Sequence, residues 1–370
     1  MIHSICELVA PEDVGINLPH EQILHNIGSI LSSSKSSEDL EIRFEDLIDY
    51  RRAPFAHGVP SLTLLIVDVT LPIDGRDELV KERLHLAERL KDLNLVTVTT
   101  FEPEKIDDNF CIGLSPTEAS ERINKILETE LMFGMERGGV VAFPGAMYQQ
   151  VHANSEALGH KELILVQGLA LTQARTHCPL YLSITFDESG RKLHDETSGL
   201  DHAVRAWVRA LLDAGAEGKK LVMCQRGPLV EIMVINPSFT STVLSSGKLL
   251  ESKTQEPASD SRLQRTQYRC YGGGGYAYLF EHFKHRILRE GVTATQWNQI
   301  VRTNVVDLLA WYVSPEAPLI PKKLSGVLDL SNYFEPIEGK YFTKFAFTYC
   351  GTKCLRRHSR QKFASLPTKT

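Results

Sequence analysis

The stretch Ser61-Leu-Thr-Leu-Leu-Ile-Val-Asp-Val-Thr70 decides the fold class of this chain. Apolar residues dominate it up to Asp68 and Thr70, which is typical of a parallel strand that is buried on both faces and has polar residues at its carboxyl end. An amphipathic helical pattern follows at Glu78–Leu90, and a second strand pattern follows at Asn94–Thr100. A strand, a helix and a strand in this order predict a βαβ unit with parallel strands.

The alternation of strand and helix patterns continues along the chain. Further helices are predicted at 116–135, 152–176, 200–214, 278–290 and 295–312, and further strands at 139–143, 179–185, 220–225 and 229–235. About seven or eight such units over roughly 300 residues fit a closed (β/α)8 barrel, the TIM-barrel form of the α/β class. A doubly wound open sheet is the alternative, but it normally carries a G-x-G-x-x-G turn after its first strand, and residues 68–76 lack one.

We therefore predict one barrel over residues 1–312 and a C-terminal extension over residues 313–370, where prolines and aromatic residues become frequent. The 370 residues carry a formal net charge of -5, so nothing indicates a nucleic-acid partner. The sequence contains no run of about 18 apolar residues, so it predicts no membrane-spanning helix. The start has no basic segment followed by an apolar one, as a signal peptide would. Seven scattered cysteines favour reduced thiols, and hence a cytoplasmic protein.

Two local patterns are candidates for chemistry in the barrel. His20 and Gln22 follow a short strand pattern, and residues two apart on a strand point the same way. With an amide in the second position, His20 is either a metal ligand or an ordinary hydrogen-bonding residue. The glycine run Tyr271–Tyr276 precedes a helix. It either brings backbone N–H groups to a phosphate or only permits positive φ and close packing.

The C-terminal extension holds Cys350, Cys354 and His358 at spacings of four residues. On a helix they would share one face, and thiolates with an imidazole suit zinc. A structural zinc site needs a fourth ligand, and no cysteine lies between Cys270 and Cys350. The alternative is a pair of buried thiols beside a surface histidine. Tyr349–His358 also resembles the second half of a MYND-like zinc knuckle, whose first half would need cysteines near positions 327 and 330.

Several segments resemble motifs of one family, in the same order along the chain. They are Val14–Gln22 (G-x-x-L-x-H-E-H in the family), Val67–Asp77 (D-x-T…G-R-D), Gly138–Gly145 (A-G-V-I-G-E-I-G), Tyr271–Tyr276 (Y-G-G-H-G-Y) and Arg302–Trp311 (a closing N-P-x-x-x-L helix). The ordered set resembles the phosphotriesterase-related proteins of the amidohydrolase superfamily. This resemblance implies a (β/α)8 barrel with two metal ions at the carboxyl ends of the strands, where a bridging water is activated.

The resemblance also implies which positions of this chain take the places of the metal ligands. They are His20 and Gln22 on the first strand, Phe143 on the fourth, Ser183 on the fifth, Gln225 on the sixth and Asp260 on the eighth. Of these, His20 and Asp260 alone keep a ligand type, since amides and hydroxyls do not replace imidazoles and a bridging carboxylate around zinc. These residues are therefore expected to line a pocket, and none is assigned a catalytic role.

The predicted function is that of a catalytically degenerate barrel, a pseudoenzyme that acts as a binding or scaffold protein for a small molecule or a protein. The alternative is a metal-dependent hydrolase of small esters, amides or phosphoesters with a rebuilt metal site around His20. Zinc is a possible cofactor through the resemblance only. A third possibility is that the extension is the functional part, with the aromatic residues of Tyr341–Tyr349 and the basic end docking a partner.

Overall fold

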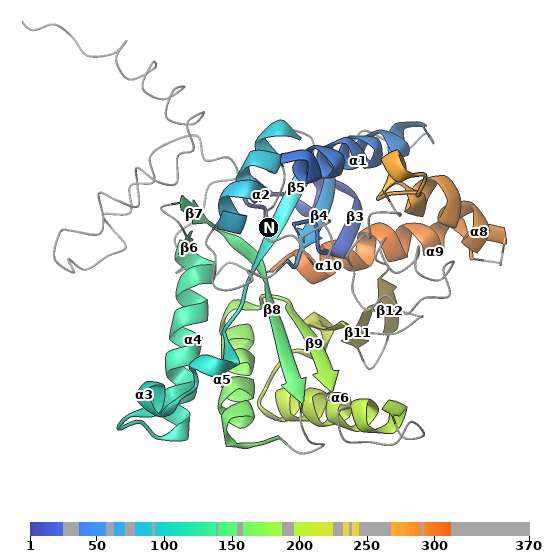
Figure 1. Ribbon diagram of the computed structural model, residues 1–370. Coiled ribbons are helices and arrows are strands. Elements are labelled where there is room, and N and C mark those ends of the chain that lie inside the picture. The colour runs from blue at the N-terminus through green and yellow to red at the C-terminus, as the bar shows by residue number, and fades with distance from the viewer. Residues whose placement is uncertain are drawn as a thin grey trace, which may run out of the picture.

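A curled parallel sheet with helices on its outer face forms the body of the protein (Figure 1). The computed structural model describes residues 1–24, 37–56, 63–70, 78–90, 93–137, 140–153, 158–186, 196–224, 232–236, 239–243, 268–289 and 292–311. None of the helices in these ranges is long and apolar enough to cross a membrane.

Among the described residues, eight strands form the main sheet, in the order β12-β11-β10-β9-β8-β5-β4-β3. Six of them run parallel: β3 (Val14–Glu21), β4 (Thr63–Asp68), β5 (Leu93–Thr99), β8 (Pro144–Ala153), β9 (Leu180–Phe186) and β10 (Leu221–Cys224). The hairpin of β11 (Ile232–Asn236) and β12 (Phe239–Val243) adds to β10 in antiparallel orientation. The parallel α/β class predicted from residues 61–100 is confirmed.

The helices that connect the parallel strands pack on the outer face of the sheet. They are α1 (Ser37–Ala56), α2 (Glu78–Arg89), α3 (Asp108–Cys111), α4 (Pro116–Phe133), α5 (His160–Thr176) and α6 (Glu196–Asp213). Short 3-10 turns lie elsewhere in the chain, at Pro11–Asp13, Pro103–Lys105, Gly218–Lys220 and Arg269–Tyr271. The last helical region contains α8 (Lys284–Arg289), α9 (Ala294–Asn298) and α10 (Asn304–Leu309), with π-helical segments at Leu279–Phe283 and Gln299–Thr303. Ser115 caps α4 and Thr293 caps α9, and each residue forms a capping box.

The predicted fourth strand, 139–143, is wrong as a strand of the main sheet. Residues Val140–Ala142 form β7, which pairs with β6 (Met135–Arg137) in a separate two-stranded sheet. The fourth parallel strand is β8, and α5 begins at His160 instead of 152. A five-residue apolar run does not show which sheet it joins, and the polar residues of β8 hid a strand that is buried on both faces. The strand predicted at 229–235 is antiparallel to its neighbour.

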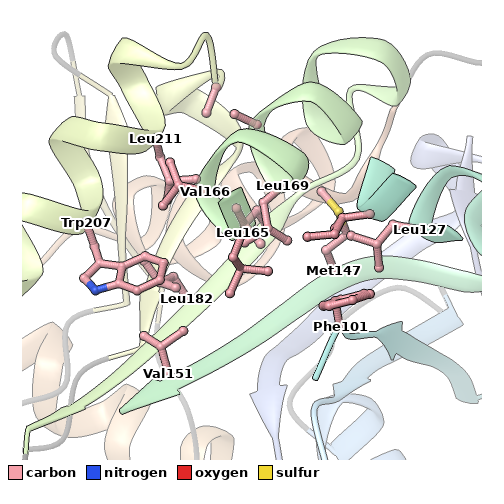
Figure 2. Packing of buried hydrophobic residues seen from close by; sticks show 14 of the residues in the cluster. Phe101, Leu127, Met147, Val151, Leu165, Val166, Leu169, Leu182, Trp207 and Leu211 are labelled. Atoms are coloured by element: carbon pink, nitrogen blue, oxygen red, sulfur yellow. The ribbon is translucent and has the colours of Figure 1, made fainter. Parts of the chain in front are cut away.

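Side chains pack on both faces of the sheet. Val67, Val96, Ala146 and Val222 face inward and form a cluster with apolar residues of α10. On the outer face, Phe101, Met147 and Leu182 pack against α4, α5 and α6 through Leu127, Leu165 and Trp207 (Figure 2). Burial on both faces is the usual environment of a parallel strand.

A buried ion pair fixes the carboxyl end of β4 to α2. Asp68 accepts a hydrogen bond from Arg83 Nε at 2.7 Å, and both side chains are almost completely inaccessible to solvent. Its Oδ1 also accepts from Ile23 N at 3.0 Å and from Thr70 N at 3.1 Å. The carboxylate therefore joins the ends of β3 and β4 to the outer helix.

The N-terminal hairpin packs at the other end of the sheet. It consists of β1 (Ile2–His3) and β2 (Leu8–Val9). The His3 ring is buried, with its centroid 4.3 Å from a Trp311 ring and 6.3 Å from that of Phe143. Burial lowers the pKa of His3 from 6.5 to about 3, and the positive charge of the N-terminus acts in the same direction.

The first prediction concerns the buried pair. Arg83→Leu leaves the Asp68 carboxylate buried without its cation, so we expect a loss of about 3–5 kcal/mol in the free energy of unfolding. Urea denaturation measures this loss. Arg175→Leu is the control, because Arg175 pairs with Glu121 and Glu128 on the surface and should cost at most about 1 kcal/mol. Equal losses in the two variants would contradict the assigned role of the pair.

The second prediction concerns acid sensitivity. Between pH 6.5 and about 3 the unfolded chain protonates His3 while the folded chain does not, so His3 lowers the stability as the pH falls, by up to about 1.4 kcal/mol per pH unit. In His3→Phe this contribution is absent. Urea denaturation at pH 7 and pH 5 should show a smaller loss in that variant than in the unmodified chain. His160→Gln, at an exposed position, should keep the original slope.

Candidate functional site

His20 lies near the carboxyl end of β3 and faces the inside of the curled sheet. Its ring is buried, with its centroid 6.0 Å from that of Tyr148 on β8 and 6.1 Å from that of Tyr181 on β9, the latter nearly parallel at 22°. In the sheet, β4 and β5 separate β3 from these two strands. The rings therefore meet across the interior, and the contact requires the sheet to curl.

A β-bulge turns His20 inward. Leu18 pairs with Ile66 and Glu21 pairs with Asp68, so β3 has one residue more than β4 in this interval. As a result Leu18 packs in the outer cluster with Leu47 and Tyr50 of α1, although it lies two residues from the inward-facing His20. Simple alternation of inward and outward side chains therefore does not hold between Leu18 and His20.

Ser183 lies close to this interior site. It follows Tyr181 by two residues on β9, so both occupy the same face of the strand. Ser183 is buried and pairs in register with Gln150 of β8 and Cys224 of β10. Sequence reasoning missed Tyr148 and Tyr181, because nothing in the local pattern shows which aromatic residues of two later strands will face His20.

The other predicted site residues are placed differently. Gln22 is half-buried and follows the last residue of β3. Phe143 precedes β8, at the amino end of the strand, and its ring contacts His3. The β8 residue that faces His20 is Tyr148, five positions further on. Gln225 and Asp260, like Cys350, Cys354 and His358, lie outside the described residues.

The described residues around His20 do not fit the two-metal centre that the resemblance implies. Its ring neighbours are two tyrosines, and the inward positions beside them are Ala146, Val222 and Cys224. Within the ranges given above, no three histidine, cysteine, aspartate or glutamate side chains lie together as a metal ion would need. We therefore derive no chemical step through a metal at this position.

The glycine run lies against a carboxylate of the protein itself. Asp46 of α1 accepts hydrogen bonds from Tyr276 N at 2.7 Å and from Arg269 N at 3.1 Å. Gly275 has a φ of +58°, and a Cβ atom there would lie 2.2–2.5 Å from the Asp46 carboxylate. Close packing, the second of the two interpretations of this run, accounts for the glycine at 275.

Backbone N–H groups and the Arg269 guanidinium partly compensate the negative charge of the carboxylates around Asp46. Burial raises the pKa of Asp46 to about 6, and the two N–H donors oppose this shift. Arg269, which donates one of them, also pairs with Asp49 at 3.2 Å and with Glu281 at 2.8 Å. The run Tyr271–Tyr276 is thus anchored to α1 and to the following helical segment by a small ionic network.

Comparisons with solved structures place the fold. A lactonase from Listeria monocytogenes matches with a TM-score of 0.54 at 14% identity, over 84% of this chain and 100% of that one. A phosphotriesterase homology protein from Escherichia coli matches with 0.52 at 14% identity, over 80% and 99%. A phosphotriesterase-like lactonase from Deinococcus radiodurans, carrying several substitutions, matches with 0.51 at 15% identity, over 84% and 100%. The fold is that of the phosphotriesterase-like TIM barrels. The predicted barrel is confirmed at this level.

The sequence comparisons add one finding, in the extension. Residues 331–366 match the Vms1-associating treble clef domain. This segment contains Cys350, Cys354 and His358 and lies within the extension predicted at 313–370. A search among curated proteins found no relative of this chain.

The third prediction tests the packing of the glycine run. Gly275→Ala would force a Cβ atom against the buried Asp46 carboxylate, and we expect a loss of at least about 2–4 kcal/mol in the free energy of unfolding. Gly113→Ala is the matched control. Gly113 has a φ of +69° but nothing within 4 Å of a Cβ atom, so its variant should lose only the roughly 1–2 kcal/mol of left-handed strain. Equal losses would show that the carboxylate contact contributes nothing.

Proposed function

We propose that this chain is a non-catalytic binding or scaffold protein, in which a phosphotriesterase-like barrel supports a C-terminal zinc-binding segment that docks a protein partner. The packing of His20 against Tyr148 and Tyr181 carries the proposal for the barrel. An imidazole packed against two aromatic rings contributes to the packed interior of the sheet.

The match to a treble clef domain supports the proposal for the extension. Structural zinc sites of such small elements use cysteine and histidine ligands, and Cys350, Cys354 and His358 are the candidates within residues 331–366. The fourth ligand is not assigned. The matched family is described as associating with the protein Vms1, which favours a protein as the partner of this segment.

The same proposal places the protein in the cytoplasm. Seven cysteines scattered along a chain of this length do not form the pattern of a disulfide framework, which supports this location.

The fourth prediction is a zinc measurement on the full chain. We expect about one zinc ion per chain by elemental analysis, because one structural site takes four ligands around one ion. Cys350→Ser combined with Cys354→Ser should remove it, and His20→Ala should leave it in place. Lactone and phosphotriester probes should show no turnover above the His20→Ala background.

The opposite result would support the hydrolase alternative. Zinc that survives the double serine substitution but is lost in His20→Ala, together with turnover that depends on His20, would place the metal in the barrel. It would overturn the proposal of a non-catalytic barrel. A chain that binds no zinc at all would overturn the proposal for the extension and leave that for the barrel standing.

A further inference from the structure

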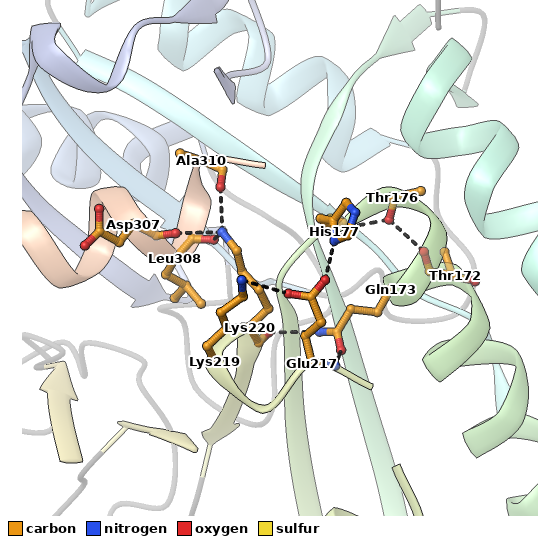
Figure 3. A network of polar contacts seen from close by, with 11 residues as sticks. Thr172, Gln173, Thr176, His177, Glu217, Lys219, Lys220, Asp307, Leu308 and Ala310 are labelled. Atoms are coloured by element: carbon orange, nitrogen blue, oxygen red, sulfur yellow. Dashed lines mark hydrogen bonds and ion pairs between the residues drawn. The ribbon is translucent and has the colours of Figure 1, made fainter. Parts of the chain in front are cut away.

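Lys220 connects the start of β10 to the end of α10. Its side chain is buried, and its Nζ lies 2.6 Å from the carbonyl oxygen of Asp307, 2.7 Å from that of Leu308 and 2.5 Å from that of Ala310 (Figure 3). On its backbone side, the Lys220 carbonyl accepts a hydrogen bond from Gln173 Nε2 of α5 at 3.0 Å. One residue thus joins the last described helix to β10 and to α5.

The geometry suits a protonated lysine. The last carbonyls of a helix have no partner within the helix, and they form the negative end of its dipole. An ammonium group has three N–H donors, which here meet three carbonyl acceptors. Cys178, Lys219, Glu217 and Asp307 are the titratable groups around it. Burial lowers the pKa of Lys220 to about 8, which leaves most of the side chain charged at pH 7.

A second set of contacts holds the same place. Trp311 N donates to the Met1 carbonyl at 3.4 Å, and the Trp311 ring packs on His3 of the N-terminal hairpin. Trp311 is almost completely buried and is the last described residue before the extension. We call residues 307–311 the root of the extension, because everything from 312 to the treble clef match at 331–366 continues from them.

The root and His20 lie at opposite ends of the parallel sheet. Lys220 directly precedes β10, and Phe143, which also contacts His3, directly precedes β8, so both mark the amino end. His20 is the last residue but one of β3 and marks the carboxyl end. Because parallel strands share their ends, Trp311 lies at the end of the sheet opposite to His20.

We propose that Lys220 is a positioning residue that latches the root to the amino end of the barrel, so that Trp311, the last described residue before the extension, is held at the end opposite to His20. The protein partner of that segment rests on the proposed function. The latch itself does not, because the hydrogen-exchange measurement that tests it requires neither bound zinc nor a partner.

The fifth prediction compares two neighbouring lysines in the full chain by hydrogen exchange. Lys220→Met keeps the aliphatic stem but removes all three donors. We expect the amides of residues 308–311 to exchange at least 10-fold faster, while those of β5 and β9 exchange at the original rate. Lys219→Met is the matched control. Lys219 is 67% exposed and pairs with Glu217 at 3.3 Å on the surface, so its variant should keep the root within 2-fold of the original rate.

Three outcomes would overturn the latch. They are an unchanged root in Lys220→Met, an acceleration that is uniform over the root and the strands, and a Lys220→Met chain that fails to fold, since a latch must be dispensable to the barrel. Lys220→Arg adds a rescue, because it restores N–H donors and should recover at least half of the lost protection. Zinc content in Lys220→Met should equal that of the unmodified chain, and this separates failure of the latch from failure of the proposed function.

Discussion

The meeting of the His20, Tyr148 and Tyr181 rings across the interior depends on the curl of the sheet, and the curl sets where everything else can lie. A flat sheet would hold β3 far from β8 and β9, since two strands separate β3 from β8 and three separate it from β9, at a spacing of about 4.8 Å each. Once the sheet curls, the inner face is closed by its own side chains and the outer face is left for the helices. Function in such a barrel can then reside only at the ends of the strands or outside it.

The residues of the motifs that stand out in the sequence form hydrogen bonds, ion pairs and close contacts within the protein itself. Asp68, in the D-x-T segment, binds Arg83 and three groups at the ends of β3 and β4. The run around Gly275 closes on the carboxylate of Asp46. Polar groups that would bind metal or phosphate in another protein here satisfy each other, which is the usual requirement for burying them. A motif therefore identifies a fold more safely than it identifies an activity.

Local pattern sufficed for the elements whose signals are local. The strands at 61–70, 94–100 and 179–185 and the caps at Ser115 and Thr293 follow from residues next to each other. The fourth strand was misplaced, because the choice between β7 and β8 depends on which run pairs with β5. Asp46 and Gly275 are separated by more than two hundred residues, and no periodicity links them. Of the candidate site, the sequence identified His20, but its aromatic neighbours come from other strands.

The bulge in β3 has a consequence for how such a barrel can diverge. Between Leu18 and Glu21, β3 has one residue more than β4 has between the paired residues. The side chain that faces the interior therefore depends on the number of residues in this interval as well as on their identity. Losing or gaining a single codon there would exchange inner and outer side chains at the mouth of the barrel, while the pairing of Val14 with Thr63 upstream stays in place. The insertion or deletion of one residue is therefore a route by which such a strand acquires or loses an inward-facing histidine in one step, without any substitution.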